Sequence, residues 1–311
     1  MRKTIFFGLL IFLSMSVMSV WGWENEAADK MLLEAIQNDK LSDVELAIEN
    51  GANVNYVDGY GKTALMYACE KQSYPIVKKL IDTGLVNASF QNDFGQTALM
   101  FAAKYFDNEV VLKTLVDKAA ANINGRDNSG KSVLMYAVEN KSVVALDFLL
   151  KRGANTNAVD VNQNDVMLWA VKQRNKDAVR RLINVTSVSW DQVDSDGKDA
   201  FMIACEMGAT NIAEIIFSSN SAFDIGRTNE SGLPLLLWLV DTRKSYRLIE
   251  GMLDRYGYAK IIGLRDRAGN DIYYYADLRN DVTLLNKLDE MEADYKRALE
   301  RRKERKARAS K

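Results

Sequence analysis

The 311-residue sequence contains no histidine, two prolines and two cysteines. Without histidine, the chain can form neither a Ser-His-Asp triad nor a Cys-His nucleophile pair, and it has no imidazole to bind a metal. The net charge is −1, so the chain as a whole shows no sign of nucleic-acid binding. With 48% hydrophobic and 27% charged residues, most of the chain is expected to be folded and soluble.

The first 22 residues have the pattern of an export signal. Arg2 and Lys3 precede an uncharged stretch over residues 4–23, and Ser19 and Gly22 offer small residues for cleavage. We therefore expect residues 1–22 to be removed and the mature protein to be periplasmic or secreted. Alternatively, residues 4–23 remain as an uncleaved anchor, since twenty uncharged residues can just span about 30 Å of bilayer.

A block of eight residues recurs seven times along the chain. Its clearest copies are 61–68 (GKTALMYA), 95–102 (GQTALMFA) and 130–137 (GKSVLMYA). Weaker copies occupy residues 163–170, 197–204, 232–239 and 269–276. Successive blocks begin 33 to 37 residues apart, and such a period indicates a repeat architecture.

Each position of the repeat has a physical role. An aspartate or asparagine stands three residues before every block, where its side chain can fix a turn: Asp58, Asn92, Asp127, Asp160, Asp194, Asn229 and Asp266. Six of the seven blocks begin with glycine, and six carry Thr, Ser or Asp two residues later, where a helix N-cap is expected. Two amphipathic runs follow in each unit. The pattern predicts a turn and two short helices per unit, which must stack on their neighbours to bury an apolar face.

The segment TALMYA resembles the T-P-L-H-x-A signature of the ankyrin repeat family, with methionine in the histidine position. The resemblance covers residues 29–290 and implies an all-α solenoid of about eight helix-turn-helix units with short β-turn or hairpin loops. Residues 29–50 lack the preceding turn and fit an N-terminal cap. With the export signal, the chain resembles exported, bacterial-type ankyrin repeat proteins. The resemblance implies a non-catalytic scaffold that binds a protein partner through its turn tips and concave helix face, and we expect a monomer without a cofactor or metal.

Residues 125–132, GRDNSGKS, match the phosphate-binding pattern G-x-x-x-x-G-K-[ST]. In the repeat register, however, Asp127 is the turn residue, Gly130 begins the block and Ser132 is the cap. Lys131 then falls at a loop position that other copies fill with varied residues. The register favours a repeat turn over a nucleotide-binding enzyme, and no enzymatic activity is expected.

The two cysteines occupy equivalent positions in different units. Cys69 and Cys205 each lie eight residues after the start of a block, and four repeats separate them. If helices stack at about 8–10 Å per layer, the sulfurs lie far beyond the roughly 7 Å Cα separation that a disulfide allows. We predict two buried, unpaired thiols.

Aromatic residues recur six residues after the block start in six of seven copies: Tyr67, Phe101, Tyr136, Trp169, Trp238 and Tyr275. This regularity favours a role in packing, whereas the alternative is an aromatic ladder that binds a ligand. Binding residues are expected where the repeats differ instead. The candidates, on and near the turn tips, are Tyr56, Tyr60, Phe90, Phe94 and Trp190. The alternative for these rings is that they fold back on their own repeat.

The chain ends in a basic segment, residues 291–311, which continues the helical pattern of the last repeat. From Lys296 onward it carries nine basic and two acidic residues. One interpretation is a solvated helix. The other is a contact of residues 296–311 with an anionic membrane or an acidic partner, which would favour a membrane-associated structural or tethering protein.

Overall fold

The computed structural model describes residues 26–140, 143–185, 187–220, 223–229, 231–243 and 245–309. The predicted export signal, residues 1–22, lies outside these described residues. The chain divides into two compact units, residues 1–181 and 182–311, and each is described by itself.

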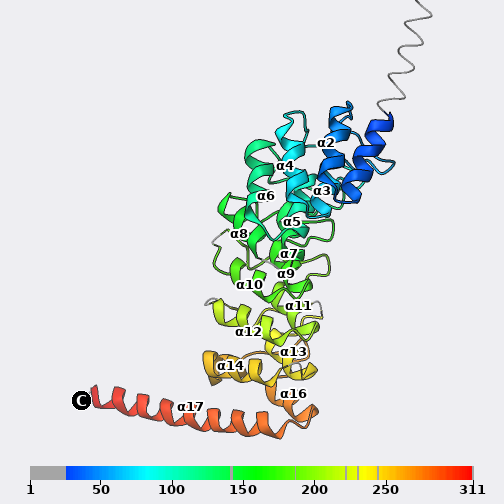
Figure 1. The fold of residues 1–311 in the computed structure, drawn as a ribbon. Helices are drawn as coiled ribbons and strands as arrows, with labels where there is room; N and C mark the ends of the chain where they lie inside the picture. Colours follow the sequence, from blue (N-terminus) through cyan, green and yellow to red (C-terminus); the bar gives the residue numbers. More distant parts are fainter. Residues whose placement is uncertain are drawn as a thin grey trace, which may run out of the picture. The chain divides into compact units, whose positions relative to one another are not determined.

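Unit 1 consists of helix pairs joined by turns. Residues 26–37 form a helix that pairs with α2 (Leu41–Glu49). The next pairs are α3 (Ala64–Glu70) with α4 (Tyr74–Asp82), α5 (Ala98–Tyr105) with α6 (Glu109–Lys113), α7 (Val133–Glu139) with α8 (Val144–Lys151), and α9 (Val166–Lys172) with α10 (Lys176–Leu182). Helices α3, α5, α7 and α9 pack on one another in one row, and α4, α6 and α8 form a second row (Figure 1).

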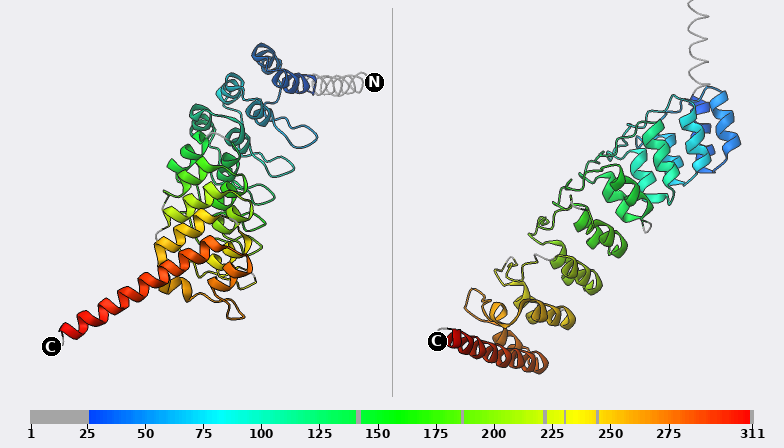
Figure 2. Two further views of the ribbon diagram at one scale, coloured as in Figure 1. Left: turned by 90° about the horizontal axis from the view of Figure 1, so that it is seen from below. Right: turned by 90° about the vertical axis from the view of Figure 1, so that its left-hand side faces the viewer.

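Unit 2 repeats this arrangement with two additions. Its pairs are α11 (Ala200–Glu206) with α12 (Thr210–Ser219), α13 (Leu235–Thr242) with α14 (Tyr246–Tyr256), and α16 (Ile272–Leu278) with α17 (Val282–Ala309). A short helix, α15 (Tyr258–Ile262), is inserted before the last turn, and α17 continues well past the helices on which it packs (Figure 2). The described residues thus form eight helix pairs, and the predicted all-α repeat fold is confirmed.

The repeated block places its apolar residues in the core. The Leu-Met pair of each strong copy is no more than 2% exposed: Leu65 and Met66, Leu99 and Met100, Leu134 and Met135. The residue before the helix acts as its cap, since the hydroxyls of Thr63 and Ser132 accept from the N–H groups of Met66 and Met135. The methionine sulfurs accept in return from the N–H groups of the two caps, at 3.5 and 3.4 Å. Methionine therefore forms a side-chain link across the helix start at the signature's histidine position.

Two local features differ from the simple pattern of two α-helices per repeat. Helix α6 continues as a π-helical turn, η1 (Thr114–Lys118). The insertion of α15 coincides with the longest block spacing, between residues 232 and 269. Neither feature was predicted, because both interrupt the second half of a single repeat, where the copies agree least in sequence.

Both cysteines are buried and neither forms a disulfide bond, as predicted. Cys69 is fully enclosed at the end of α3, and burial raises the pKa of its thiol because the thiolate would lose its hydration. A buried, protonated thiol is a core residue and not a reactive one.

The first residue of each block adopts a left-handed backbone conformation. Gly95 has φ +76° and Gly197 has φ +71°, and Gln163, the one residue that replaces glycine, has φ +59°. The space around these residues differs. A β-carbon on Gly95 would lie 2.6 Å from the backbone nitrogen of Asn128 in the next turn, whereas one on Gly197 would meet nothing within 4 Å.

Gly95→Ala is therefore expected to destabilise the protein more than Gly197→Ala does. Both substitutions place alanine in the left-handed region, at a cost of about 1 kcal/mol. Only the change at Gly95 also displaces the next turn. Urea unfolding followed by circular dichroism compares the two variants, and equal shifts of the unfolding midpoint would contradict the close packing of consecutive turns.

Asp165 caps α9 from inside the core and is 1% exposed. Its Oδ1 accepts from the N–H of Leu168 at 2.9 Å, whereas its Oδ2 has no hydrogen-bond partner among the described residues. Burial raises the pKa of Asp165 to about 6. The equivalent cap in unit 2, Asp199, differs because its Oδ2 pairs with Arg227 at 2.5 Å.

We predict that Asp165→Ser stabilises the protein at pH 7.5 and has little effect at pH 4. A carboxyl group whose pKa is higher in the folded state favours folding most below pH about 4 and loses that contribution as the pH rises through about 6, here by up to about 3 kcal/mol. Serine keeps the cap, as Ser132 does, without a buried charge. Thermal unfolding between pH 4 and 8 is the measurement, and a pH-independent difference would refute this account.

Candidate functional site

Each repeat turn is built around one aspartate or asparagine side chain. In the second turn of unit 1, Asn92 Oδ1 accepts from the N–H groups of Phe94 and Gln96, at 3.1 and 2.8 Å. The N–H of Asn92 donates to the carbonyl of Gln96 at 3.0 Å and closes the hairpin. Asp58 does the same in the preceding turn, where the N–H groups of Tyr60 and Lys62 donate to its Oδ1, both at 2.9 Å. These bonds fix the tip residue, which is the middle residue of the turn, by its backbone alone.

Consecutive tips in unit 1 are also bonded to one another. The carbonyl of Tyr60 accepts from the N–H of Asp93, and the carbonyl of Phe94 accepts from the N–H of Asn128, both at 3.0 Å. The carbonyl of Ser129 accepts in the same way from Val161, at 2.9 Å. The tips therefore form a backbone ladder whose side chains are not needed for its structure.

The ladder holds two of the predicted binding residues in solvent. Tyr60 is 69% exposed and Phe94 is 61% exposed, so neither ring folds back on its own repeat. Phe90, two residues before the turn residue Asn92, is 39% exposed, and Tyr56 at the equivalent position is half-buried. Unit 1 therefore presents two fully projecting rings on adjacent tips, with two partly exposed rings on the segments that lead to them.

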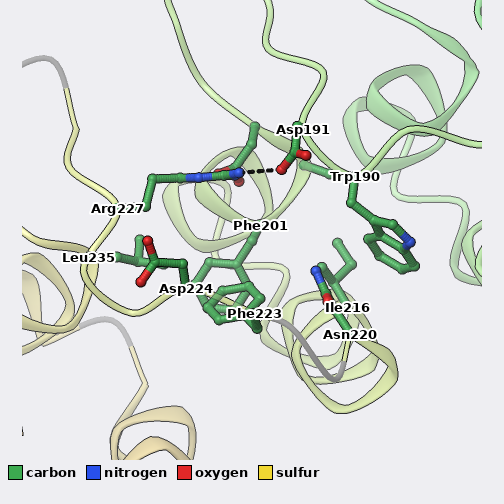
Figure 3. A pocket seen from close by; sticks show the side chains of 11 residues that line it. Trp190, Asp191, Phe201, Ile216, Asn220, Phe223, Asp224, Arg227 and Leu235 are labelled. Carbon is green, nitrogen blue, oxygen red and sulfur yellow. Dashed lines mark hydrogen bonds and ion pairs between the residues drawn. The ribbon is translucent and has the colours of Figure 1, made fainter. Parts of the chain in front are cut away.

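Trp190, the fifth predicted residue, lies apart from the turn tips, on unit 2. It is half-buried and lines a pocket of about 80 Å³, where Asp191 lies beside it and Arg227 lies on the opposite side (Figure 3). Arg227 pairs with Asp191 at 2.6 Å and with the cap residue Asp199 at 2.5 Å, so its charge is balanced within the unit. This pocket is small and internally neutralised, and Trp190 is a weaker candidate than Tyr60 and Phe94.

The recurring aromatic residues have a role that sequence reasoning missed. In four repeats the ring donates a hydrogen bond to Oδ2 of the turn aspartate nine residues earlier. The bonds are Tyr67 to Asp58 at 2.6 Å, Tyr136 to Asp127 at 2.7 Å, Trp169 Nε1 to Asp160 at 3.0 Å and Tyr275 to Asp266 at 2.7 Å. Burial, together with this bond, raises the pKa of Tyr67 and of Tyr275 to about 12.

The four bonding rings therefore fasten the first helix to its turn, in addition to packing. Of these, Tyr136 and Tyr275 are no more than 9% exposed, whereas Tyr67 and Trp169 are half-buried. The sequence carried a signal for this role. Asn92 is nine residues before a phenylalanine, which cannot donate, whereas the four bonding rings all follow an aspartate.

Lys131, the lysine of the phosphate-binding pattern, is enclosed in the same layer. It is 7% exposed, with its ammonium 4.0 Å from the ring centre of Tyr136 and 4.4 Å from that of Trp169. It also forms an ion pair with Glu139. A lysine that binds phosphate must reach the ligand, and this one is instead held between two rings and a carboxylate. The match at residues 125–132 is therefore a repeat turn, as its register predicts.

The basic C-terminal segment lies on the second half of α17. Leu284 and Leu288, at the start of this helix, are completely buried, whereas every residue from 293 to 305 is exposed. Lys296 pairs with Glu292 at 2.9 Å, one helical turn earlier. Four basic residues form no ion pair with any described residue: Arg301, Arg302, Lys303 and Arg305.

The part of the chain that the structure describes contains neither a membrane-spanning helix nor a cluster of metal ligands. No described helix is both long and apolar enough to cross a bilayer. Within the same residues, no cluster of three or more Cys, Asp or Glu side chains is placed to hold a metal ion.

Comparison with known proteins identifies the repeats. A profile for ankyrin repeats (three copies) matches residues 20–87, 71–160 and 156–229, which together span more than half of the chain. The chain is 38% identical over 119 residues to the B-cell lymphoma 3 protein homolog of Mus musculus, covering 37% of this chain and 26% of that protein. It is 30% identical over 131 residues to putative ankyrin repeat protein FPV034 of Fowlpox virus (strain NVSL), covering 42% and 30% respectively.

A third relative is tyrosine-protein kinase Shark of Drosophila melanogaster, 30% identical over 161 residues that cover 51% of this chain and 17% of the kinase. The chain thus spans less than a third of the length of each of these relatives. The profile match and the helix pairs agree, and the chain belongs to the ankyrin repeat family.

Proposed function

We propose that this chain is an exported scaffold that binds a protein partner through the turn tips of unit 1 and the adjoining face of the first helices. Ankyrin repeats are generally non-catalytic domains for protein–protein interaction. The observation that carries the proposal for this surface is the exposure of Tyr60 and Phe94, at 69% and 61%, on adjacent tips.

Such rings suit the centre of an interface. Tyrosine and other large aromatic residues dominate the binding energy of protein interfaces when a partner encloses them. Because the backbone ladder already fixes both tips, ordering them on binding costs little conformational entropy. The partly exposed Phe90 and Tyr56 extend the apolar surface on the segments that lead to the tips.

Export is the second part of the proposal and rests on residues 1–22, which combine a basic start, an uncharged stretch and small residues near the end. The competing function is a membrane-associated tether. The exposed, basic second half of α17 favours it, because unpaired arginine and lysine side chains are attracted to anionic lipid. An uncleaved N-terminal segment would act in the same direction.

We expect the double variant Tyr60→Ala/Phe94→Ala to lose its partner while remaining folded. Tagged protein expressed in its native host would be cross-linked and captured from envelope fractions, and the captured proteins would be identified by mass spectrometry. A partner retained by the wild type should fall at least tenfold with the double variant, since an enclosed aromatic anchor contributes about 2 kcal/mol or more. The turn bonds involve only the backbone of both residues, so the melting temperature should not change.

The matched control is Leu85→Ala/Val110→Ala. These side chains are also in unit 1 and are 70% and 50% exposed, but neither is on a turn tip. An equal loss of the partner in both double variants would show that the tips are not the binding surface.

The N-terminus of the protein purified from its host separates export from anchoring. We predict a mature chain that begins at Val20 or Trp23, in a soluble envelope or secreted fraction. The measurement is N-terminal mass spectrometry of fractionated cells. Recovery of a chain that starts at Met1 and remains with membranes would favour the tether.

A further inference from the structure

One repeat of unit 2 lacks the carboxylate that the bonding rings contact elsewhere. Trp238 follows Asn229 by nine residues, as Trp169 follows Asp160. Trp169 donates its indole N–H to Oδ2 of Asp160. At the equivalent place, Asn229 has an amide, and no described residue accepts a hydrogen bond from Trp238 Nε1.

The orientation of the Asn229 amide follows from its partners. Its Oδ1 accepts from the N–H of Leu233 at 2.9 Å and from the hydroxyl of Ser231 at 2.7 Å. A backbone N–H can only donate, so the atom that faces Leu233 must be the oxygen. The other branch is then the Nδ2 amide group, which is itself a donor, and among the described residues nothing accepts from it. Two N–H donors are left where four other repeats place a donor and an acceptor.

Both donors line a pocket of about 260 Å³. Its apolar part is formed by the half-buried indole of Trp238 and by Met202, which is 3% exposed. Its charged part is the ion pair of Lys198 and Glu206, both of which line the pocket, with the ammonium 2.9 Å from the carboxylate. At about 30 Å³ per water molecule, the pocket has room for a side chain of several heavy atoms.

We propose that this pocket binds a carboxylate from the partner, namely a glutamate or aspartate side chain of a protein segment. The ligand oxygens accept from Trp238 Nε1–H and Asn229 Nδ2–H, as Asp160 Oδ2 accepts from Trp169. The Lys198 ammonium lines the same pocket and already pairs with Glu206. A carboxylate offers two oxygens to the two N–H donors, whereas a neutral amide side chain offers only one, so the pocket prefers glutamate to glutamine.

This inference deepens the proposed function, on which it relies only in taking the ligand to be part of a protein. The pocket lies on unit 2, whereas Tyr60 and Phe94 are on unit 1. The pocket proposal and the turn-tip proposal can therefore be refuted independently. The other turn with asparagine shows why the pocket is confined to one repeat. Asn92 Nδ2 donates to Gln96 Oε1 at 2.9 Å, and Phe101 has no N–H or O–H to satisfy.

The test follows the indole N–H signals of the full-length protein by ¹H–¹⁵N NMR. Five tryptophans give five indole signals, which are assigned with Trp→Phe variants. The probes are N-acetyl-glutamate amide and N-acetyl-glutamine amide. We expect the first to move the Trp238 signal saturably, with an affinity at least fivefold above that of the second. The Trp169 signal is the internal control, because its N–H is already bonded to Asp160, and it should not move.

Asn229→Asp supplies the missing carboxylate from within the chain. In this variant the Trp238 signal should shift without any probe and should no longer respond to N-acetyl-glutamate amide. Asn92→Asp is the matched control and should leave the response unchanged. Equal responses to the two probes, or an unaltered response in Asn229→Asp, would overturn the proposal. Free glutarate is a third probe. If glutarate bound much more tightly than blocked glutamate, the ligand would be a small dicarboxylic acid and not a protein side chain, and the proposal would be overturned.

Discussion

The bonds of one carboxylate or amide oxygen at each turn are the constraint on which the repeat depends. In six of the seven described turns that oxygen accepts two backbone N–H groups, two and four residues further on, so it replaces much of the hydrogen bonding that a longer strand pair would supply. The glycine that follows takes a left-handed conformation, which brings the helix cap back beside the turn. The cap starts the first helix, and this helix carries the Leu-Met pair into the core. Turn, cap and core are thus consecutive consequences of the same hydrogen bonds.

This arrangement separates the residues that hold the structure from those that can bind. Tyr60 and Phe94 contribute backbone groups to the turns and to the ladder between them, so their side chains are free to differ among repeats. The rings one layer below are in the opposite situation, since Tyr67 and Tyr136 each fasten a helix to a turn aspartate. An aromatic residue in this fold is therefore interpreted by its register position and not by its type.

Most of the architecture could be predicted from the sequence because each element depends on local chemistry that is repeated seven times. The turn residues, the caps and the two helices of each repeat were all predicted, as was the burial of Cys69 and Cys205. The insertion of α15 and the π-helical turn after α6 were not, since each occurs once and has no second copy for comparison. The exposure of Tyr60 and Phe94, and the half-burial of Trp190, depend on how side chains meet neighbouring elements, which spacing alone does not specify.

Comparing equivalent positions of the repeats also separates a chance sequence motif from a repeat whose hydrogen bonding differs from that of the others. Residues 125–132 match a phosphate-binding pattern, yet each of their side chains does what its register requires, and Lys131 is satisfied by Glu139 and two rings. Asn229 and Trp238 match no known pattern, but both residues line a pocket and leave two donors without a protein acceptor where four other repeats have a bonded pair. Unpaired donors in a partly buried place are unfavourable unless water or a ligand accepts from them. In a repeat protein, binding specificity is thus expected in a repeat whose hydrogen-bond donors lack acceptors within the chain. It is not expected merely where a short sequence motif recurs.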